Sequence, residues 1–201
     1  IYACGARPRT LGLPGEAELI GHGVSYCALC DGSFFKDQDV TVVGGGNSAF
    51  DDALLLSERC HHVTLIHRRS SFRAEQILVD RVKQRNNISL LIDMTVSELI
   101  QKNGQLTGLA LKSKIGKDET LPVSGLFVAL GGLPDTQVLV GLATLDENGY
   151  VISDEKMAVS ETPGLFVAGD CRIKRVCQLT TAVSDGTIAA ISACEYLKKH
   201  K

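Results

Sequence analysis

The sequence predicts an α/β fold organised around a Rossmann-like βαβ unit. Two apolar runs, with a glycine-rich turn and a helical pattern between them, are the basis of this prediction. Residues 40–43 form a short run of β-branched residues, typical of a central strand, and a glycine-rich turn follows at once. Residues 49–59 repeat apolar side chains at helical spacing, and residues 63–66 form a second apolar run. A strand, a glycine turn, a helix and a second strand in immediate succession are typical of a unit that binds a dinucleotide.

The glycine-rich turn carries the fingerprint Gly44-x-Gly46-x-x-Ala49. Gly44 permits a tight turn, Gly46 lets the backbone approach a pyrophosphate, and the small Ala49 allows the helix to pack closely on the strand. The N–H groups at the start of the helix, at Asn47 and Ser48, would then face the phosphates. A tight turn without a ligand is the alternative, and the flanking strand and helix make it the weaker one.

The end of the second predicted strand indicates which dinucleotide is bound. NAD-selective units place an acid there to bind the ribose hydroxyls, whereas this chain has His67, Arg68 and Arg69, followed by Arg73. Guanidinium groups bind a 2′-phosphate in bidentate fashion, and a carboxylate would repel it. A solvated basic surface is the alternative. The position of the arginines within the unit favours NADPH.

The segment after the arginines is predicted to add a helix and a second sheet. Residues 73–85 have helical spacing, with Ile77, Leu78 and Val82 on the apolar face. Residues 88–114 have a strand-like pattern, which predicts an antiparallel meander packed on the nucleotide-binding unit. Together these elements predict a three-layer domain.

The two ends of the chain contain further predicted elements. Residues 1–6 have the pattern of the end of a buried strand running into a glycine turn, so we expect the chain to be the C-terminal part of something longer. Residues 126–130 and 165–168 are predicted to be buried strands, and residues 178–198 a long helix. The predicted apolar face of that helix includes Leu179, Ala182, Val183, Ala190, Ile191 and Leu197.

Upstream of the glycine turn lies Cys27-Ala28-Leu29-Cys30-Asp31, a pair of thiols one helical turn apart with an acid directly after them. This spacing is typical of a dithiol that exchanges electrons with a disulfide, but a metal site or a structural turn would use it too. A zinc site needs two further ligands, and Cys171 and Cys177 lack the spacing of a second such pair. We therefore expect no metal. Phe34 and Phe35 follow the pair and are expected to pack inside rather than to form an apolar contact surface.

Composition narrows the possible classes of protein. A net charge of −2 gives no electrostatic reason to expect nucleic acid or an anionic membrane surface as a partner. No apolar run has the length of roughly 20 residues that a spanning helix needs. Seven cysteines is an odd and scattered set, which favours a reducing compartment, so we expect a cytoplasmic protein. Cys60 and Cys194 fall on predicted helices and are expected to be buried, inert thiols.

These pieces in this order resemble the bacterial, low-molecular-weight thioredoxin reductase family, here the C-terminal part without the N-terminal half of the FAD domain. The matching stretches are residues 3–6, 27–32, 44–49, 67–75 and 164–170. The resemblance implies that electrons pass from NADPH through FAD to the Cys27–Cys30 pair and on to thioredoxin. It assigns Cys30 to the flavin side, Cys27 to attack on the partner disulfide, and Asp31 to proton transfer.

The resemblance also implies the remaining sites and the domains. Residues 1–8 would end a first FAD-domain segment, residues 9–131 would be the NADPH-binding domain, and residues 132–201 would be the C-terminal FAD-domain segment. Its expected flavin-side and hinge residues are Ala3, Gly5, Gly131, Gly169, Asp170, Gln178 and Leu179. Full-length family members are homodimers. Cys177 stands where the family often has arginine, and Ser33 and His22 also depart from its pattern near the partner surface.

Two alternatives remain open at this point. The chain could belong to a flavin disulfide reductase that serves another small dithiol protein. It could also be a truncated NADPH-binding fragment without turnover of its own.

Overall fold

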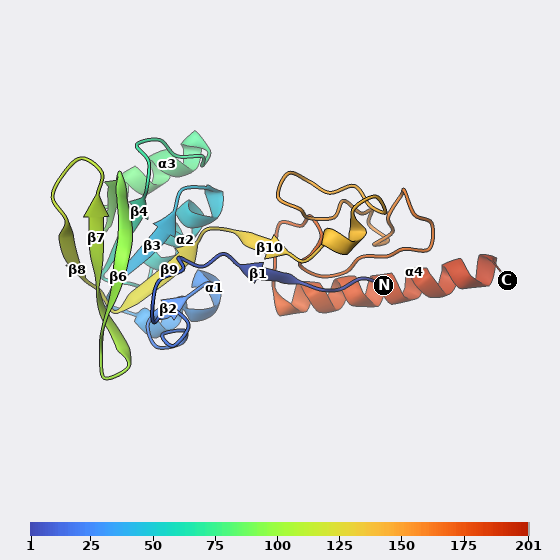
Figure 1. Ribbon diagram of the computed structural model, residues 1–201, viewed down its shortest axis with the longest axis horizontal. Coiled ribbons are helices and arrows are strands. Elements are labelled where there is room, and N and C mark those ends of the chain that lie inside the picture. The colour runs from blue at the N-terminus through green and yellow to red at the C-terminus, as the bar shows by residue number, and fades with distance from the viewer. Residues whose placement is uncertain (201) are drawn as a thin grey trace. The chain divides into compact units, whose positions relative to one another are not determined.

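The computed structural model describes residues 1–200, and the chain divides into two compact units. We call residues 9–131 the central unit, and residues 1–8 with the chain from residue 132 onward the terminal unit. Figure 1 shows the elements of both.

A five-stranded parallel sheet forms the middle layer of the central unit, with strand order β2-β9-β3-β4-β5. Its strands are β2 (Val24–Ser25), β3 (Asp39–Gly44), β4 (His62–His67), β5 (Ile88–Ile92) and β9 (Gly125–Ala129). Val40 and Val42 of β3 contribute to one buried cluster and Val43 to another. Both faces of the sheet are therefore covered, as expected for parallel strands. The predicted βαβ unit is confirmed in β3, α2 and β4.

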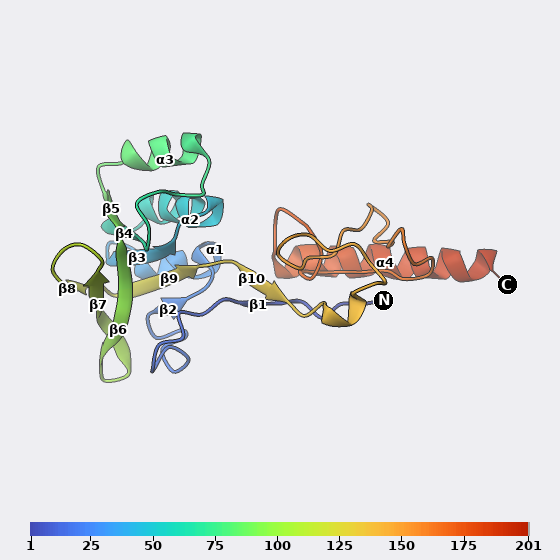
Figure 2. The same ribbon diagram turned by 45° about the horizontal axis from the view of Figure 1, so that its top comes forward.

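Helices cover one face of this sheet, and a meander of strands covers the other (Figure 2). The helices of the central unit are α1 (Ala28–Asp31), the 3-10 helix η1 (Gly32–Phe35), α2 (Asn47–Ser57) and α3 (Gln76–Lys83). The meander consists of β6 (Met94–Lys102), β7 (Gln105–Ser113) and β8 (Glu119–Pro122), paired in antiparallel fashion. The predicted three-layer arrangement is confirmed.

Two details of the central unit differ from the prediction. Helix α3 begins at Gln76 rather than at residue 73. The N–H groups of Arg73 and Ala74 donate to the carbonyl of Gly45, and these bonds hold the two residues against the glycine turn instead of in a first helical turn. Ile77 is 66% exposed, so it does not belong to the buried face of this helix.

The terminal unit contains β1 (Ala6–Pro8) paired with β10 (Gly132–Pro134), the 3-10 helix η2 (Gln137–Leu139) and the long helix α4 (Leu179–Lys199). Much of the rest is irregular. Residues 166–168 are buried and Leu165 is partly buried, but among the described residues this segment pairs only through single bridges, Tyr2 with Val167 and Ala158 with Phe166. The predicted strand there is therefore wrong, since no neighbouring segment extends these bridges into a ladder.

Helix α4 buries a different face from the one predicted. Ile188, Ala189, Ala193 and Tyr196 pack in a cluster with Met157 and Phe166. The large apolar residues of the predicted face are exposed: Leu179 81%, Val183 62%, Ile191 57% and Leu197 62%. The helix has apolar side chains on most of its sides, so their periodicity alone does not indicate which side the loops cover.

Candidate functional site

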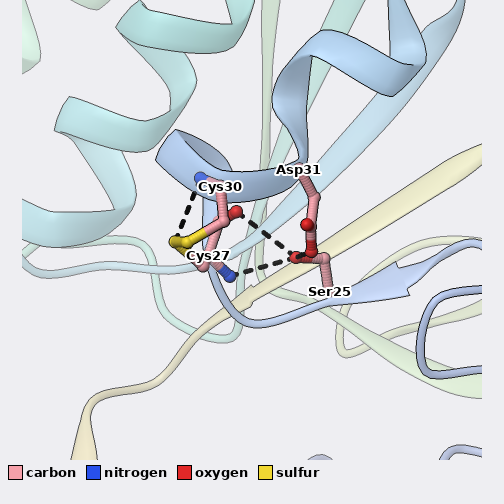
Figure 3. The surroundings of a disulfide bond; sticks show 4 residues. All are labelled: Ser25, Cys27, Cys30 and Asp31. Atoms are coloured by element: carbon pink, nitrogen blue, oxygen red, sulfur yellow. Dashed lines mark hydrogen bonds between the residues drawn. A yellow bond between two sulfur atoms is a disulfide. The ribbon is translucent and has the colours of Figure 1, made fainter. Parts of the chain in front are cut away.

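Cys27 and Cys30 form a disulfide in the structure, with their Cα atoms 5.3 Å apart (Figure 3). Cys27 is the N-cap of the short helix α1, and its Sγ accepts the N–H of Cys30 at 3.1 Å. Cys30 is exposed and Cys27 is half-buried. The predicted pair is therefore brought together as a disulfide at the surface of the central unit.

Asp31 is held by a residue that the sequence analysis missed. The Ser25 hydroxyl donates to Oδ2 of Asp31 at 2.6 Å and accepts the N–H of Cys27 at 3.0 Å. Figure 3 shows the carboxylate turned toward Ser25 rather than toward the S–S bond. Ser25 is buried at the end of β2, and only its position two residues before Cys27 hinted at this role.

Apolar side chains lie on α1 and η1, the short helices that contain and follow Cys30. Phe35 packs edge-on against Phe127, with the ring centroids 5.4 Å apart, as predicted. Phe34 is 76% exposed and Leu29 is 57% exposed. The expectation that both phenylalanines pack inside is thus wrong for Phe34, because η1 turns consecutive side chains in different directions.

The glycine turn joins the end of β3 to the start of α2. A Cβ at Gly44 would lie 2.5 Å from the Cβ of Ala49 and 2.6 Å from the carbonyl oxygen of Ala129. A Cβ at Gly46 would meet no described atom within 4 Å. No described side chain caps α2, which begins at Asn47, so its first N–H groups are available to an anion.

The loop that follows β4 presents Arg68, Arg69 and Arg73, all of them exposed. Their guanidinium groups make no hydrogen bond or ion pair with other residues of the described chain. The backbone of the same loop is anchored, because the N–H groups of Arg73 and Ala74 donate to the carbonyl of Gly45 at 2.8 and 3.2 Å. The structure thus brings the glycine turn and the arginines together.

The buried side chain of His67 contacts both the glycine turn and the arginine loop. Its ring lies against Gly45, where a Cβ would approach Cε1 to 2.2 Å, and its Nε2 lies 3.1 Å from the carbonyl oxygen of Ser71. Burial lowers the pKa of His67, and the positive charges of Arg68 and Arg69 lower it further. The ring is therefore neutral at neutral pH, with Nε2 donating to Ser71. Gly45 falls on a variable position of the fingerprint, so the sequence analysis missed that it must be glycine.

The flavin-side residues suggested by the sequence lie in the terminal unit. The bridge between Tyr2 and Val167 places Ala3 and Gly5 alongside the segment that contains Gly169 and Asp170. Gly5 and Gly169 have φ angles of +70° and +81°, which favour glycine.

Asp170 has one oxygen, Oδ1, that is buried without a hydrogen-bond partner in the described chain, and Lys174 Nζ lies 3.7 Å from it. The turn before it is fixed by Asp185, which accepts the N–H of Gly169 at 3.1 Å and pairs with Lys174 at 2.9 Å. Burial opposes the ionisation of Asp185, but these donors and Arg172 hold its pKa below the usual value.

The remaining predicted residues occupy the ends of elements. Gln178 is the N-cap of α4 and forms a capping box with Thr181, and Leu179 is the exposed first residue of that helix. Gly131 ends the central unit, where its carbonyl accepts the N–H of Arg9 at 2.9 Å. Gly131 therefore lies where the chain enters and leaves this unit.

The rest of residues 1–200 offers no second site of this kind. Within that range, no group of three or more His, Cys, Asp or Glu side chains is arranged to hold a metal ion. No helix of the described chain is long and apolar enough to span a membrane. Cys60 is buried as predicted, whereas Cys194 is exposed because it lies on the uncovered side of α4.

Comparison with known proteins gives consistent results. Residues 1–186 match the family model described as pyridine nucleotide-disulphide oxidoreductase. A thioredoxin reductase of Listeria monocytogenes is 41% identical over 100% of this chain and 63% of its own length. One of Rickettsia typhi is 40% identical over 99% of this chain and 65% of its own.

Solved structures agree with these relatives. The crystal structure of thioredoxin reductase from Streptococcus pyogenes superposes with a TM-score of 0.90 at 39% identity. The match covers 98% of this chain and 64% of that one. The chain therefore spans less than two thirds of the length of the relatives that it matches. Because the family model matches most of its residues, the chain belongs to the pyridine nucleotide-disulphide oxidoreductase family.

Proposed function

We propose that this chain functions in an NADPH-dependent flavoprotein disulfide reductase of the thioredoxin reductase type. Electrons would pass from NADPH through FAD to the Cys27–Cys30 pair and on to thioredoxin or a similar small dithiol protein. The observation that carries the proposal is the presence, within one compact unit, of an exposed disulfide, a glycine turn and a loop of unpaired arginines. The names of the relatives point to the same activity.

The central unit fits NADPH. The open space beside Gly46 would admit the pyrophosphate, and the N–H groups at the start of α2, near Asn47 and Ser48, would bind it. The unpaired guanidinium groups of Arg68 and Arg69, with Arg73, would bind the 2′-phosphate. We therefore assign residues 9–131 as the NADPH-binding domain.

The terminal unit fits part of a site for FAD. The buried Oδ1 of Asp170 lacks a hydrogen-bond partner in the described chain, and a hydroxyl donated by the cofactor would satisfy it. Gly5 and Gly169 would allow close approach of the cofactor to the backbone, with Ala3, Gly131, Gln178 and Leu179 as further contacts by resemblance. When bound, FAD would take a hydride from NADPH and supply two electrons to the disulfide. We assign residues 1–8 and 132–201 to the FAD domain.

The residues of the chain would then carry out disulfide exchange. Two electrons and two protons convert the disulfide to two thiols, and the Cys30 N–H, which already points at Cys27 Sγ, would stabilise a thiolate there. That thiolate attacks the partner disulfide and releases one partner thiolate. Cys30 then attacks the mixed disulfide, which restores the Cys27–Cys30 bond and releases the second partner thiol.

Asp31 would manage protons at the pair. Its carboxylate is linked to the Cys27 backbone through Ser25, at 2.6 and 3.0 Å, so its position is tied to the backbone of the first cysteine. We propose that Asp31 accepts a proton when the thiolate forms and returns one to the departing thiol.

The partner would dock on the apolar surface beside the disulfide, formed by Leu29 and Phe34. We further propose that the full-length protein is a cytoplasmic homodimer without nucleic-acid or membrane partners. The uncovered apolar residues of α4 and a set of thiols that suits a reducing compartment support this.

The cofactor assignment is tested by nucleotide binding. Replacing Arg68 and Arg69 with alanine should raise the Kd for NADPH more than tenfold and that for NADH less than twofold, since each lost charge-assisted contact costs about 1.5–3 kcal/mol. Arg81→Ala, an exposed arginine on α3, is the matched control. Equal losses for both nucleotides would refute the NADPH assignment.

The thiol roles are tested by trapping. Cys30→Ser should accumulate a mixed disulfide with thioredoxin on a non-reducing gel, and the double variant lacking Cys27 and Cys30 should not, which excludes the five other cysteines. Trapping by Cys27→Ser instead would reverse the roles. Absorption of the purified chain tests the flavin: a band bleached by NADPH supports the enzyme, and a colourless protein that binds NADPH supports the fragment alternative.

A further inference from the structure

Asn47 and Glu75 are joined by two reciprocal hydrogen bonds. The Asn47 amide Nδ2 donates to Oε1 of Glu75 at 2.8 Å, and the Glu75 backbone N–H donates to Oδ1 of Asn47 at 2.9 Å. Both ends of the Asn47 carboxamide are thus used on one residue, 28 positions away in the sequence. We call this pair of bonds the Asn47–Glu75 clip.

The clip connects the two halves of the proposed nucleotide site. Asn47 is the first residue of α2, directly after the glycine turn, and Glu75 is the last residue before α3. Two more bonds lie beside it, from the N–H groups of Arg73 and Ala74 to the Gly45 carbonyl. Four hydrogen bonds therefore fasten the arginine loop to the glycine turn.

Packing fixes the residue directly before these bonds. Phe72 lies edge-on against Phe50, with centroids 4.9 Å apart, and its ring is 5.4 Å from that of His67. The loop thus starts directly after β4 and is held again at residues 71–75, while the guanidinium groups of Arg68 and Arg69 stay exposed and unpaired. An anion that binds them need not order the backbone, and this removes an entropic cost from binding.

We propose that Asn47 and Glu75 are positioning residues that preset the arginine loop and so set the preference for NADPH over NADH. This rests on the proposed function. Asn47 then acts through Glu75 and not by touching the phosphate with its side chain. The pyrophosphate is common to both nucleotides and lies at the glycine turn, whereas only the 2′-phosphate needs the loop.

The charge of Glu75 gives the proposal a sharp test. A carboxylate near a phosphate site weakens anion binding through repulsion, so the charge of Glu75 opposes binding and only the clip favours it. Glu75→Gln keeps a side-chain acceptor for Asn47 and removes the charge, whereas Glu75→Ala removes that acceptor and leaves only the bond from the backbone N–H. If the clip matters, these two variants change NADPH binding in different directions.

The experiment measures Kd for NADPH and for NADH by nicotinamide fluorescence on the 201-residue chain. Asn47→Ala and Glu75→Ala should each raise the Kd for NADPH three- to tenfold and that for NADH less than twofold. Glu75→Gln should bind NADPH at least as tightly as the wild type. Because Asn47→Ala already removes both bonds of the clip, the double variant should lose no more than Asn47→Ala alone. Gln76→Ala, which removes the exposed neighbouring side chain, is the matched control.

Each outcome decides the inference. Equal losses for NADPH and NADH, no loss in either alanine variant, or a Glu75→Gln variant as weak as Glu75→Ala would overturn it. Circular dichroism melting checks that each variant is folded. If Asn47→Ala perturbs α2, Glu75→Ala still tests the clip, because Glu75 lies outside both helices. A wild-type chain that binds NADH as tightly as NADPH would instead refute the cofactor assignment under the proposed function.

Discussion

Gly46→Ala should separate stability from nucleotide binding. Gly46 has φ −103° and ψ 179°, an extended conformation that alanine adopts freely, and its Cβ would meet no described atom within 4 Å. A compatible Gly→Ala change stabilises by about 0.4–1 kcal/mol through the unfolded chain. Alanine is a poorer N-cap than glycine by a similar amount, about 0.5–1 kcal/mol. The free energy of unfolding should therefore stay within about 1 kcal/mol of the wild type.

Binding should respond differently, because the new methyl group would occupy the space proposed for the pyrophosphate. The Kd for NADPH and that for NADH should both rise more than tenfold, equivalent to a loss of about 1.4 kcal/mol or more. Nicotinamide fluorescence measures binding, and circular dichroism measures unfolding.

Gly44→Ala is the matched control for this change. Its Cβ would collide with Ala49 at 2.5 Å and with the Ala129 carbonyl at 2.6 Å, so it should lose about 1–3 kcal/mol of stability. If Gly46→Ala unfolds as readily as Gly44→Ala, or binds nucleotide like the wild type, the reasoning about the open space is wrong.

Three further substitutions test charges inside the two units. Burial, with a smaller effect of Asp51, raises the pKa of Asp52 to about 6, so the free energy of unfolding should decrease as the pH rises from about 4 to about 6. Asp52→Asn should then be about 1–3 kcal/mol more stable at pH 7 but not at pH 4, with Asp51→Asn as the control. Burial lowers the pKa of His67, so stability should fall as pH drops below 6.5; His67→Gln should flatten this part of the melting profile, and an unchanged slope would contradict the assignment. Asp185→Asn leaves the buried Lys174 with only the more distant carboxylate of Asp170, at 3.7 Å, and should cost about 3 kcal/mol in urea denaturation; a wild-type midpoint would exclude a structural role for the Asp185–Lys174 pair.

The parts of the fold that the sequence predicted are those with local signals. The β3–α2–β4 unit follows from a β-branched run, a glycine turn and helical spacing, all within one short stretch. The start of α3 could not be predicted in this way, because the N–H groups of Arg73 and Ala74 bond to Gly45, far away in the sequence. The buried face of α4 likewise depends on which loops cover it and not on its own pattern.

The same distinction holds for the site. Cys27 and Cys30 lie one helical turn apart, so their spacing alone indicated that they could pair. The support of Asp31 by Ser25 and the need for glycine at position 45 depend on three-dimensional contacts that no spacing rule describes. Sequence reasoning therefore identified the groups that carry the chemistry better than the groups that hold them in place.

Helix α2 shows why the disulfide and the nucleotide site belong to one mechanical unit. Its N-terminus follows Gly46. Near its other end, Leu56 packs closely against Gly32, where an added Cβ would lie 2.9 Å from Leu56 Cδ2. Gly32 comes directly after Asp31 and begins η1. The ten residues from Gly46 to Leu56 span about 15 Å at the helical rise. A helix packed at both ends transmits displacement, so any movement that carries the glycine turn must carry the dithiol with it.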